Sequence, residues 1–246
     1  MNMVLFRRLF YALLPLLLSG AVQLSTPAYA GEADVAGEAD VAGETDSAGE
    51  TDTAGETDGT EATDRACEMG DPGMTVAGFH KKLLGVMQRA GELRYQGRYR
   101  ELEPYINNCF DIALITDIIL GRYRNRLDEA QKTEFNNLFS RFSAATYASR
   151  FDGYGGEEFL ETSREATRRG RVLIRTELRR PGDDAVSLDY LLHEKQGKWY
   201  IISVSADGVN DLSLKRAEYA AVIKEKGYNG LLNGILFKIE QMETGN

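Results

Sequence analysis

Three consecutive segments with strand character constrain the fold of this chain more than any other feature. They run over Arg171–Arg180, Ala185–Glu194 and Lys198–Ser205, and turn-forming residues separate them. In the first two segments apolar side chains alternate with polar ones, so each strand has one apolar and one polar face. Short turns between such strands predict antiparallel hairpins, and the alternation predicts a sheet with one solvated face.

Helical segments flank these strands on both sides. Asp111 is expected to cap a short apolar helix that Gly121 ends, and Asp128 a longer helix that reaches about Phe151. Two further helices, separated by Gly227, are predicted near the C-terminus. The expected fold class is α+β: a curved antiparallel sheet of about four strands, wrapped by several helices around an apolar cavity.

The side chains expected to face this interior come from two helices and three strands. They are Ile115, Ile118, Ile119, Phe135, Leu138, Phe139, Phe142, Val172, Ile174, Leu188, Tyr190, Leu192, Ile202 and Val204. Apolar stripes of this kind usually pack into a core, and from the residues alone this interpretation is favoured. The alternative is that some of them line a ligand cavity.

Several short motifs, spread in order along the chain, resemble a known family. They are Leu120-Gly121-Arg122-Tyr123, Gln131 with Phe135 and Phe139, Tyr147-Ala148, Gly197-Lys198-Trp199-Tyr200, Asp207-Gly208-Val209, Arg216 with Tyr219, and Gly230-Leu231-Leu232. This set is similar to the periplasmic phospholipid-binding proteins of the toluene-tolerance type, the soluble MlaC-like shuttles of the Mla lipid-transport system. The resemblance extends over about half to three quarters of the mature chain, so no single short motif carries it.

The resemblance implies a function in lipid transport. The helix that begins after Asp128 carries Phe135, Phe139 and Phe142 on one face. This helix and the concave face of the sheet would form the wall that holds the lipid. The implied partners are an inner-membrane lipid transporter complex and an outer-membrane lipoprotein complex, with no cofactor. The segment from Asp207 to Arg216 looks more like the branch associated with hopanoid lipids, so the cargo is a phospholipid or a hopanoid-type lipid.

The N-terminus has the pattern of a secretory signal peptide over residues 1–30. Arg7 and Arg8 precede an apolar stretch from Leu9 to Leu18, and Ala28-Tyr29-Ala30 supplies the small residues of a cleavage site. Cleavage after Ala30 predicts a periplasmic protein. An uncleaved anchor is the alternative, which the short apolar stretch disfavours.

Residues 31–66 form a linker whose first thirty residues are five six-residue repeats that begin with Gly-Glu. The linker holds twelve acidic residues and one basic residue, and almost no large apolar side chain, so it is expected to be disordered. Calcium binding is the alternative, but the repeats lack the apolar positions that stack in calcium-binding solenoids. Residues 67–246 hold 26 acidic and 26 basic residues. This neutral balance gives no sign of nucleic-acid binding.

The predicted lipid-binding domain, residues 67–246, contains both cysteines of the chain. In an oxidising compartment Cys67 and Cys109 can form a disulfide that ties the start of the domain to its second helical region. The alternative is two separate buried thiols. A monomer is expected.

No motif for catalysis or metal binding stands out in the sequence. The only histidines, His80 and His193, have no second ligand at metal-binding spacing, and His193 is expected to be solvated beside Glu194. Nucleophile elbows and phosphate-binding glycine loops are missing. We therefore expect a binding protein with no catalytic residues. Two alternatives stay open: a small isomerase or hydrolase on a similar curved-sheet scaffold with an apolar substrate, and an envelope adaptor that binds no ligand.

Overall fold

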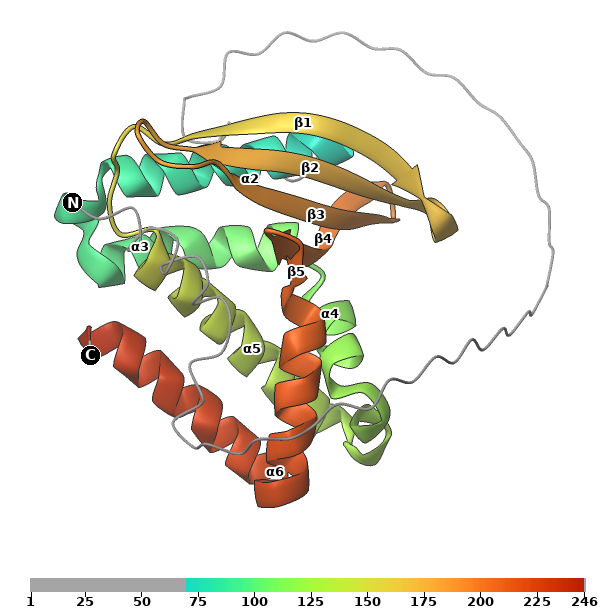
Figure 1. Ribbon diagram of the computed structural model, residues 1–246. Coiled ribbons are helices and arrows are strands. Elements are labelled where there is room, and N and C mark those ends of the chain that lie inside the picture. The colour runs from blue at the N-terminus through green and yellow to red at the C-terminus, as the bar shows by residue number, and fades with distance from the viewer. Residues whose placement is uncertain (1–69, 246) are drawn as a thin grey trace, which may run out of the picture. The chain divides into compact units, whose positions relative to one another are not determined.

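A computed structural model describes residues 70–245 of the protein (Figure 1). The helices are α2 (Pro72–Gln88), α3 (Ala90–Cys109), α4 (Ile112–Leu120), α5 (Glu129–Arg150) and α6 (Asp211–Thr244), with short 3-10 turns η2 (Gly121–Arg126) and η3 (Arg168–Gly170). The strands are β1 (Glu158–Thr167), β2 (Arg171–Arg179), β3 (Val186–Lys195), β4 (Lys198–Ala206) and β5 (Val209–Asn210). The predicted signal peptide and acidic repeat lie outside the described residues.

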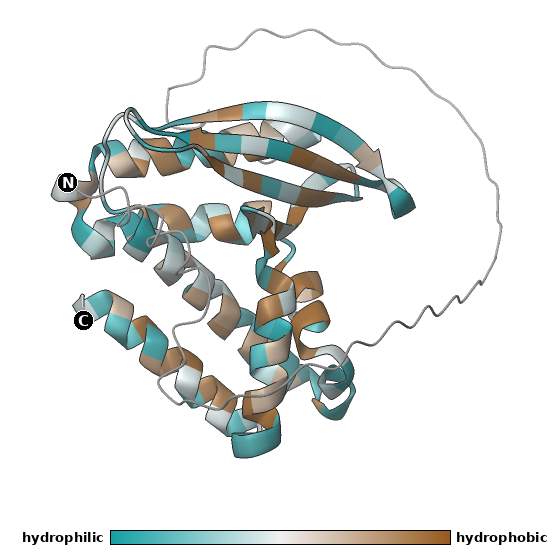
Figure 2. Ribbon diagram, viewed as in Figure 1, coloured by the Kyte–Doolittle hydropathy of each residue, from teal (hydrophilic) through white to brown (hydrophobic). Residues whose placement is uncertain are grey.

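The strands form one open antiparallel sheet in the order β1-β2-β3-β4-β5. This confirms the predicted α+β class and the three central strands. On β3, every second side chain from Val186 to Leu192 is buried, and on β2 the same holds from Ile174 to Leu178. Figure 2 shows the resulting alternation of apolar and polar residues along the strands. The polar strand β1 forms the edge of the sheet.

The fourth strand departs from simple alternation. A register shift between Leu191 and Leu192 interrupts its pairing with β3, and Ile201, Ile202 and Ser203 are buried in succession. A bulge of this kind bends the strand and turns neighbouring side chains. Helices α2, α3, α4 and α6 all contact β4. Because consecutive side chains point to opposite faces, the three buried residues show that both faces of the strand are covered there.

Local capping signals define the starts and ends of the central helices. The Asp111 carboxylate accepts a hydrogen bond from the backbone N–H of Leu114 at 3.0 Å, and Gly121 ends α4 with φ +53°. Asp128 and Gln131 form a reciprocal capping box at the start of α5. These features agree with the sequence prediction, because caps depend on residues only three positions apart.

The boundaries of α2 and α3 differ from those that the sequence predicts. The sequence predicts a helix over Thr75–Leu93 followed by a short helix or turn around Pro104. Instead α2 ends at Gln88, and α3 continues to Cys109 with a break at Arg94, where φ is +51°. The buried Arg98 guanidinium donates to the carbonyl of Ala148 on α5 at 2.8 Å. A tertiary contact thus holds a polar helix that apolar periodicity does not reveal.

The C-terminal helical region folds over the other helices. Gly227 has φ +72° and breaks α6 into two arms, which Figure 1 shows at a sharp angle, in agreement with the predicted boundary. The arms pack against α4 and α5. The core lies between the sheet and these helices, and its largest fully buried side chains include Phe79, Phe135, Tyr190 and Tyr219.

Candidate functional site

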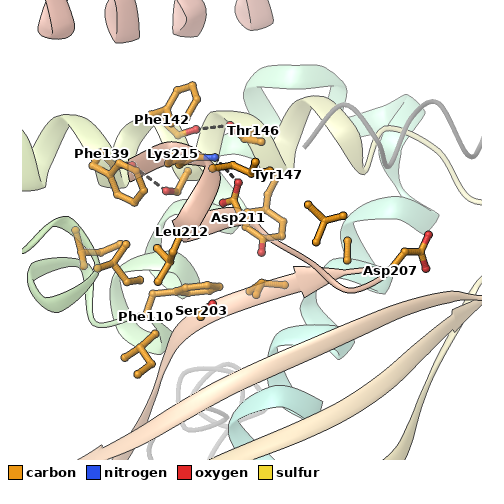
Figure 3. A pocket seen from close by; sticks show the side chains of 18 residues that line it. Phe110, Phe139, Phe142, Thr146, Tyr147, Ser203, Asp207, Asp211, Leu212 and Lys215 are labelled. Atoms are coloured by element: carbon orange, nitrogen blue, oxygen red, sulfur yellow. Dashed lines mark hydrogen bonds and ion pairs between the residues drawn. The ribbon is translucent and has the colours of Figure 1, made fainter. Parts of the chain in front are cut away.

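An apolar pocket lies where β4, α5 and the start of α6 meet, beside the first turn of α4 (Figure 3). Its volume is about 90 Å³. The lining residues are Phe110, Ile112, Ile115, Phe139, Phe142, Ser143, Thr146, Tyr147, Ile202, Ser203, Val204, Ala206, Asp207, Val209, Asp211, Leu212, Leu214 and Lys215. Aromatic and aliphatic side chains predominate, which is typical of a small-molecule site.

The chain between α3 and α4 is fixed to the sheet at one wall of this pocket. Phe110 forms a parallel bridge with Ile201, and the Asp111 N–H donates to the Ile201 carbonyl at 3.1 Å. The Phe110 ring then packs edge-on against Phe79, with centroids 5.2 Å apart. These contacts position Phe110 and Ile112 in the lining.

The turn between β4 and α6 forms another wall. The Asn210 amide donates to the Ser203 hydroxyl at 2.8 Å, while its oxygen accepts from the Ser213 N–H at 3.0 Å and caps α6. Asp207 has a φ of +48°, and its carboxylate accepts a hydrogen bond from the Ser187 N–H at 3.1 Å. This turn therefore fixes the start of α6 against the strand.

One ion pair stands among the apolar lining residues. The Lys215 ammonium lies 2.6 Å from the Asp211 carboxylate, and their side chains are 14% and 31% exposed. The same ammonium is 5.8 Å from the centre of the Phe142 ring on α5, and Figure 3 shows Lys215 and Asp211 joined by a dashed line. Burial, together with the negative charge of Asp211, raises the pKa of Tyr147. Its hydroxyl is therefore protonated at neutral pH.

The structure brings five of the sequence-predicted site residues to this pocket: Ile115, Phe139, Phe142, Ile202 and Val204. The other nine lie away from its lining. Seven of these are buried in the core, namely Ile119, Phe135, Leu138, Ile174, Leu188, Tyr190 and Leu192. Ile118 and Val172 are half-buried. A role in ligand binding stays a prediction for all fourteen.

Several lining residues were not predicted from the sequence. Tyr147, Asp207 and Val209 belong to motifs that carry the family resemblance, so a signal for them was present. Asp211 and Lys215 lie four positions apart at the start of a predicted helix and therefore share one face. Their proximity to α5 could not be read from the sequence, because it depends on how α6 packs.

The two histidines have different environments. His193 was expected to be solvated, but its Nε2 lies 3.0 Å from the Asp111 carboxylate and its side chain is only 19% exposed. The fold of β3 against the start of α4 creates this contact, so the expectation was wrong. His80 is buried, its Nε2 is 2.9 Å from the Tyr190 hydroxyl, and its ring stacks on Phe159. Burial lowers the pKa of His80 to about 3.

Two other hollows are larger but less suited to an apolar ligand. One of about 470 Å³ lies between α2 and the β1–β2 edge, and one of about 280 Å³ lies between α4 and α5; both are more open and more polar. Within residues 70–245, no cluster of three or more His, Cys, Asp or Glu side chains is arranged to bind a metal. None of the described helices has the length and apolar character needed to cross a membrane.

The predicted disulfide is only partly within the described residues. Cys109 is fully buried at the end of α3 and is disulfide-bonded. Cys67 lies outside the described residues, so its pairing with Cys109 stays a prediction.

Comparison with known proteins places the chain in a family. A family model described as MlaC protein matches residues 79–235, which is more than half of the chain. The chain belongs to the MlaC family. The match begins in α2 and ends in α6, so it spans the sheet and every element that lines the pocket.

A solved structure has the same fold. It is described as the phospholipid-binding protein from Ralstonia solanacearum in complex with a phospholipid. It is 20% identical to this chain, has a TM-score of 0.63, and the alignment covers 70% of this chain and 99% of that one. No curated protein matches the chain significantly.

Proposed function

We propose that the protein is a periplasmic lipid carrier. Its cargo would be a phospholipid or a hopanoid-type lipid, held in the pocket between β4, α5 and α6. The single observation that carries this proposal is the pocket itself, a largely apolar space at the meeting point of sheet and helices. Membership of the MlaC family and the likeness to a protein with a bound phospholipid support it. The exchange partners would be transporter complexes of the inner and outer membranes.

Acyl chains give this pocket its expected affinity. Each buried CH₂ group contributes about 0.8 kcal/mol, so a single long chain binds well without a specific polar contact. Pockets for drug-sized ligands hold roughly 300–1,000 Å³, whereas this one holds about 90 Å³. The walls therefore have to separate when a lipid enters. Phe142 and Leu212 are half-buried and line the pocket. Their side chains would pack against a bound acyl chain.

The lining favours binding over catalysis. The hydroxyls of Ser143 and Thr146 donate to the carbonyls of Phe139 and Phe142 on their own helix, which leaves neither oriented by a base. A steroid-type isomerase or a hydrolase would instead need an acid–base pair with well-separated pKa values. An adaptor without a ligand would have a filled interior at this place.

A test of this function fills the pocket by substitution. Val204→Phe adds a ring to a half-buried lining residue, and Val222→Phe is the matched control on α6, half-buried but away from the pocket. Lipid is extracted from each purified protein and measured by mass spectrometry. We expect bound lipid in the wild type and the control, and a several-fold loss in Val204→Phe. Wild-type protein that carries no lipid and acquires none from vesicles would contradict the proposal.

A further inference from the structure

We propose that Lys215 binds the phosphate group of the lipid, and that Asp211 occupies the same ammonium when no lipid is present. This inference rests on the proposed function and narrows its cargo to phosphate-bearing lipids. It follows from the position of one ion pair in an otherwise apolar pocket. The Lys215 Nζ lies 2.6 Å from the Asp211 carboxylate, and both residues line the pocket.

Lys215 is a charged donor in this lining with protons to spare. An ammonium carries three N–H groups, and in the described residues Lys215 makes one hydrogen bond, to Asp211. The hydroxyls of Ser143 and Thr146 already donate to helix carbonyls. Tyr147 adds a neutral donor, because burial raises its pKa and keeps the hydroxyl protonated. A phosphate diester, which offers only acceptors, fits this set of groups.

The exchange of partners at Lys215 is balanced in charge. A phosphate diester carries one negative charge, as the Asp211 carboxylate does, so the ammonium keeps one anionic partner before and after binding. The Asp211 carboxylate also acts on Arg150. Burial lowers the pKa of Arg150, and the negative charge of Asp211 offsets part of this shift. The Lys215 ammonium thus keeps an anionic partner in a partly buried site, where an unpaired charge would be costly.

An uncharged lipid meets a different situation. It offers no anion to Lys215, so the Asp211–Lys215 pair has to remain closed beside it. The apolar lining then contributes in the same way to both kinds of cargo, and the ion pair alone distinguishes them. The discrimination is expected to be about tenfold, because the phosphate can also accept from the Lys215 N–H groups that Asp211 does not use, and a hydrogen bond to a charged group contributes roughly that factor in affinity.

The experiment compares two lipids with the same acyl chains. Delipidated full-length mature protein is mixed with phosphatidylglycerol or with diacylglycerol in mild detergent and passed through gel filtration, and retained lipid is measured by mass spectrometry. We expect the wild type to retain phosphatidylglycerol about tenfold better. Lys215→Gln should lose this preference but bind diacylglycerol as the wild type does. Lys215→Arg keeps the positive charge and should retain the preference for phosphatidylglycerol.

Two further variants separate a binding role from a structural one. Asp211→Asn removes the competing carboxylate, so phosphatidylglycerol retention should rise. If the pair were only structural, replacing either Asp211 or Lys215 would weaken binding. Lys238→Gln is the matched control, because Lys238 pairs with Glu218 at 2.6 Å on the same helix but does not line the pocket. If Lys215→Gln does not fold, Lys215→Arg and Asp211→Asn decide the question.

The outcomes distinguish this inference from the proposed function. Equal retention of both lipids by the wild type, or equal loss of both in Lys215→Gln, overturns the role of Lys215 and leaves lipid binding standing. Retention of neither lipid by the wild type overturns both. Inorganic phosphate is tested as a competitor, and displacement of phosphatidylglycerol at equimolar phosphate would assign the site to a free anion and overturn the inference.

Discussion

Gly121 and Arg216 lie against each other at the corner where α4 ends. A Cβ atom at position 121 would come within 3.2 Å of the Arg216 Nη2 atom. Gly121 also has φ +53° and ψ −127°, a conformation that side chains disfavour. Two separate motifs of the family resemblance thus meet in space, and the contact explains why a glycine stands at one of them.

Gly121→Ala is expected to lower the free energy of unfolding by about 1–3 kcal/mol, because it forces an L-residue into a strained backbone and displaces the guanidinium. The measurement is urea unfolding followed by the fluorescence of Trp199, the single tryptophan.

Gly234→Ala is the matched control for this change. Gly234 is exposed in α6, and a Cβ atom at this position would meet no other atom within 4 Å. Alanine there should raise the free energy of unfolding by roughly 0.5–1 kcal/mol. Equal effects of the two substitutions would show that the corner carries no strain.

Asp111→Ala is expected to cost more than the loss of a helix cap. Its carboxylate is 7% exposed and accepts from the Leu114 N–H at 3.0 Å, from His193 at 3.0 Å and from Lys195 at 3.4 Å. We expect a loss of about 2–4 kcal/mol, since a cap and charge-assisted hydrogen bonds disappear together. Thermal and urea unfolding measure the change.

The comparison for Asp111 is Asp128→Ala. Asp128 is exposed and caps α5 through the Gln131 N–H at 2.8 Å. Its removal should cost about 0.5–2 kcal/mol. If both substitutions cost the same, the contacts of Asp111 to His193 and Lys195 add nothing to stability.

The free energy of unfolding should decrease as the pH is lowered, and part of this decrease should come from His80. Burial lowers its pKa to about 3 in the folded protein, from 6.5 in an exposed histidine. As the pH falls, the unfolded chain therefore binds the proton before the folded protein does. The contribution of the neutral, buried His80 to stability is complete above about pH 6.5 and is lost progressively as the pH falls towards 3. The full effect is roughly 3–5 kcal/mol.

A His80→Phe variant tests this dependence. Phenylalanine keeps an aromatic ring against Phe159 but cannot titrate, so unfolding free energies measured between pH 7 and pH 4 should decline less steeply than in the wild type. The carboxylates titrate in both proteins and cancel in the difference. Parallel pH profiles would contradict a neutral, buried His80.

Reduction should destabilise the protein if Cys109 pairs with Cys67. The predicted bridge closes a loop of about forty residues and contributes about 4 kcal/mol in the chain-entropy model. Reducing agent and Cys67→Ser should therefore lower the free energy of unfolding by similar amounts. An unchanged unfolding curve for Cys67→Ser would exclude this pairing.

Deletion of residues 31–66 should leave the domain intact. Their acidic repeats hold almost no side chain that builds a core. We expect the same melting temperature and the same amount of bound lipid with and without them. A calcium-dependent change in circular dichroism that disappears on deletion would instead favour the calcium-binding alternative.

The sequence by itself determined the three central strands, the helices that Asp111 and Asp128 cap, the break at Gly227 and the buried faces of β2 and β3. Alternation along β2 and β3, and the caps at Asp111 and Asp128, depend on residues two or three positions apart, and such local rules hold whatever the surroundings. The family could be identified for a related reason, because its motifs are short and keep their order along the chain.

Only the tertiary structure decided which of these faces is filled and which is hollow. Phe135 and Phe139 share one stripe, yet Phe139 lines the pocket and Phe135 does not. Whether an apolar side chain meets atoms or space depends on contacts between distant segments. The pocket is built from residues 110–115, 139–147 and 202–215, and the position of Lys215 beside Phe142 exists only because α6 folds back against α5.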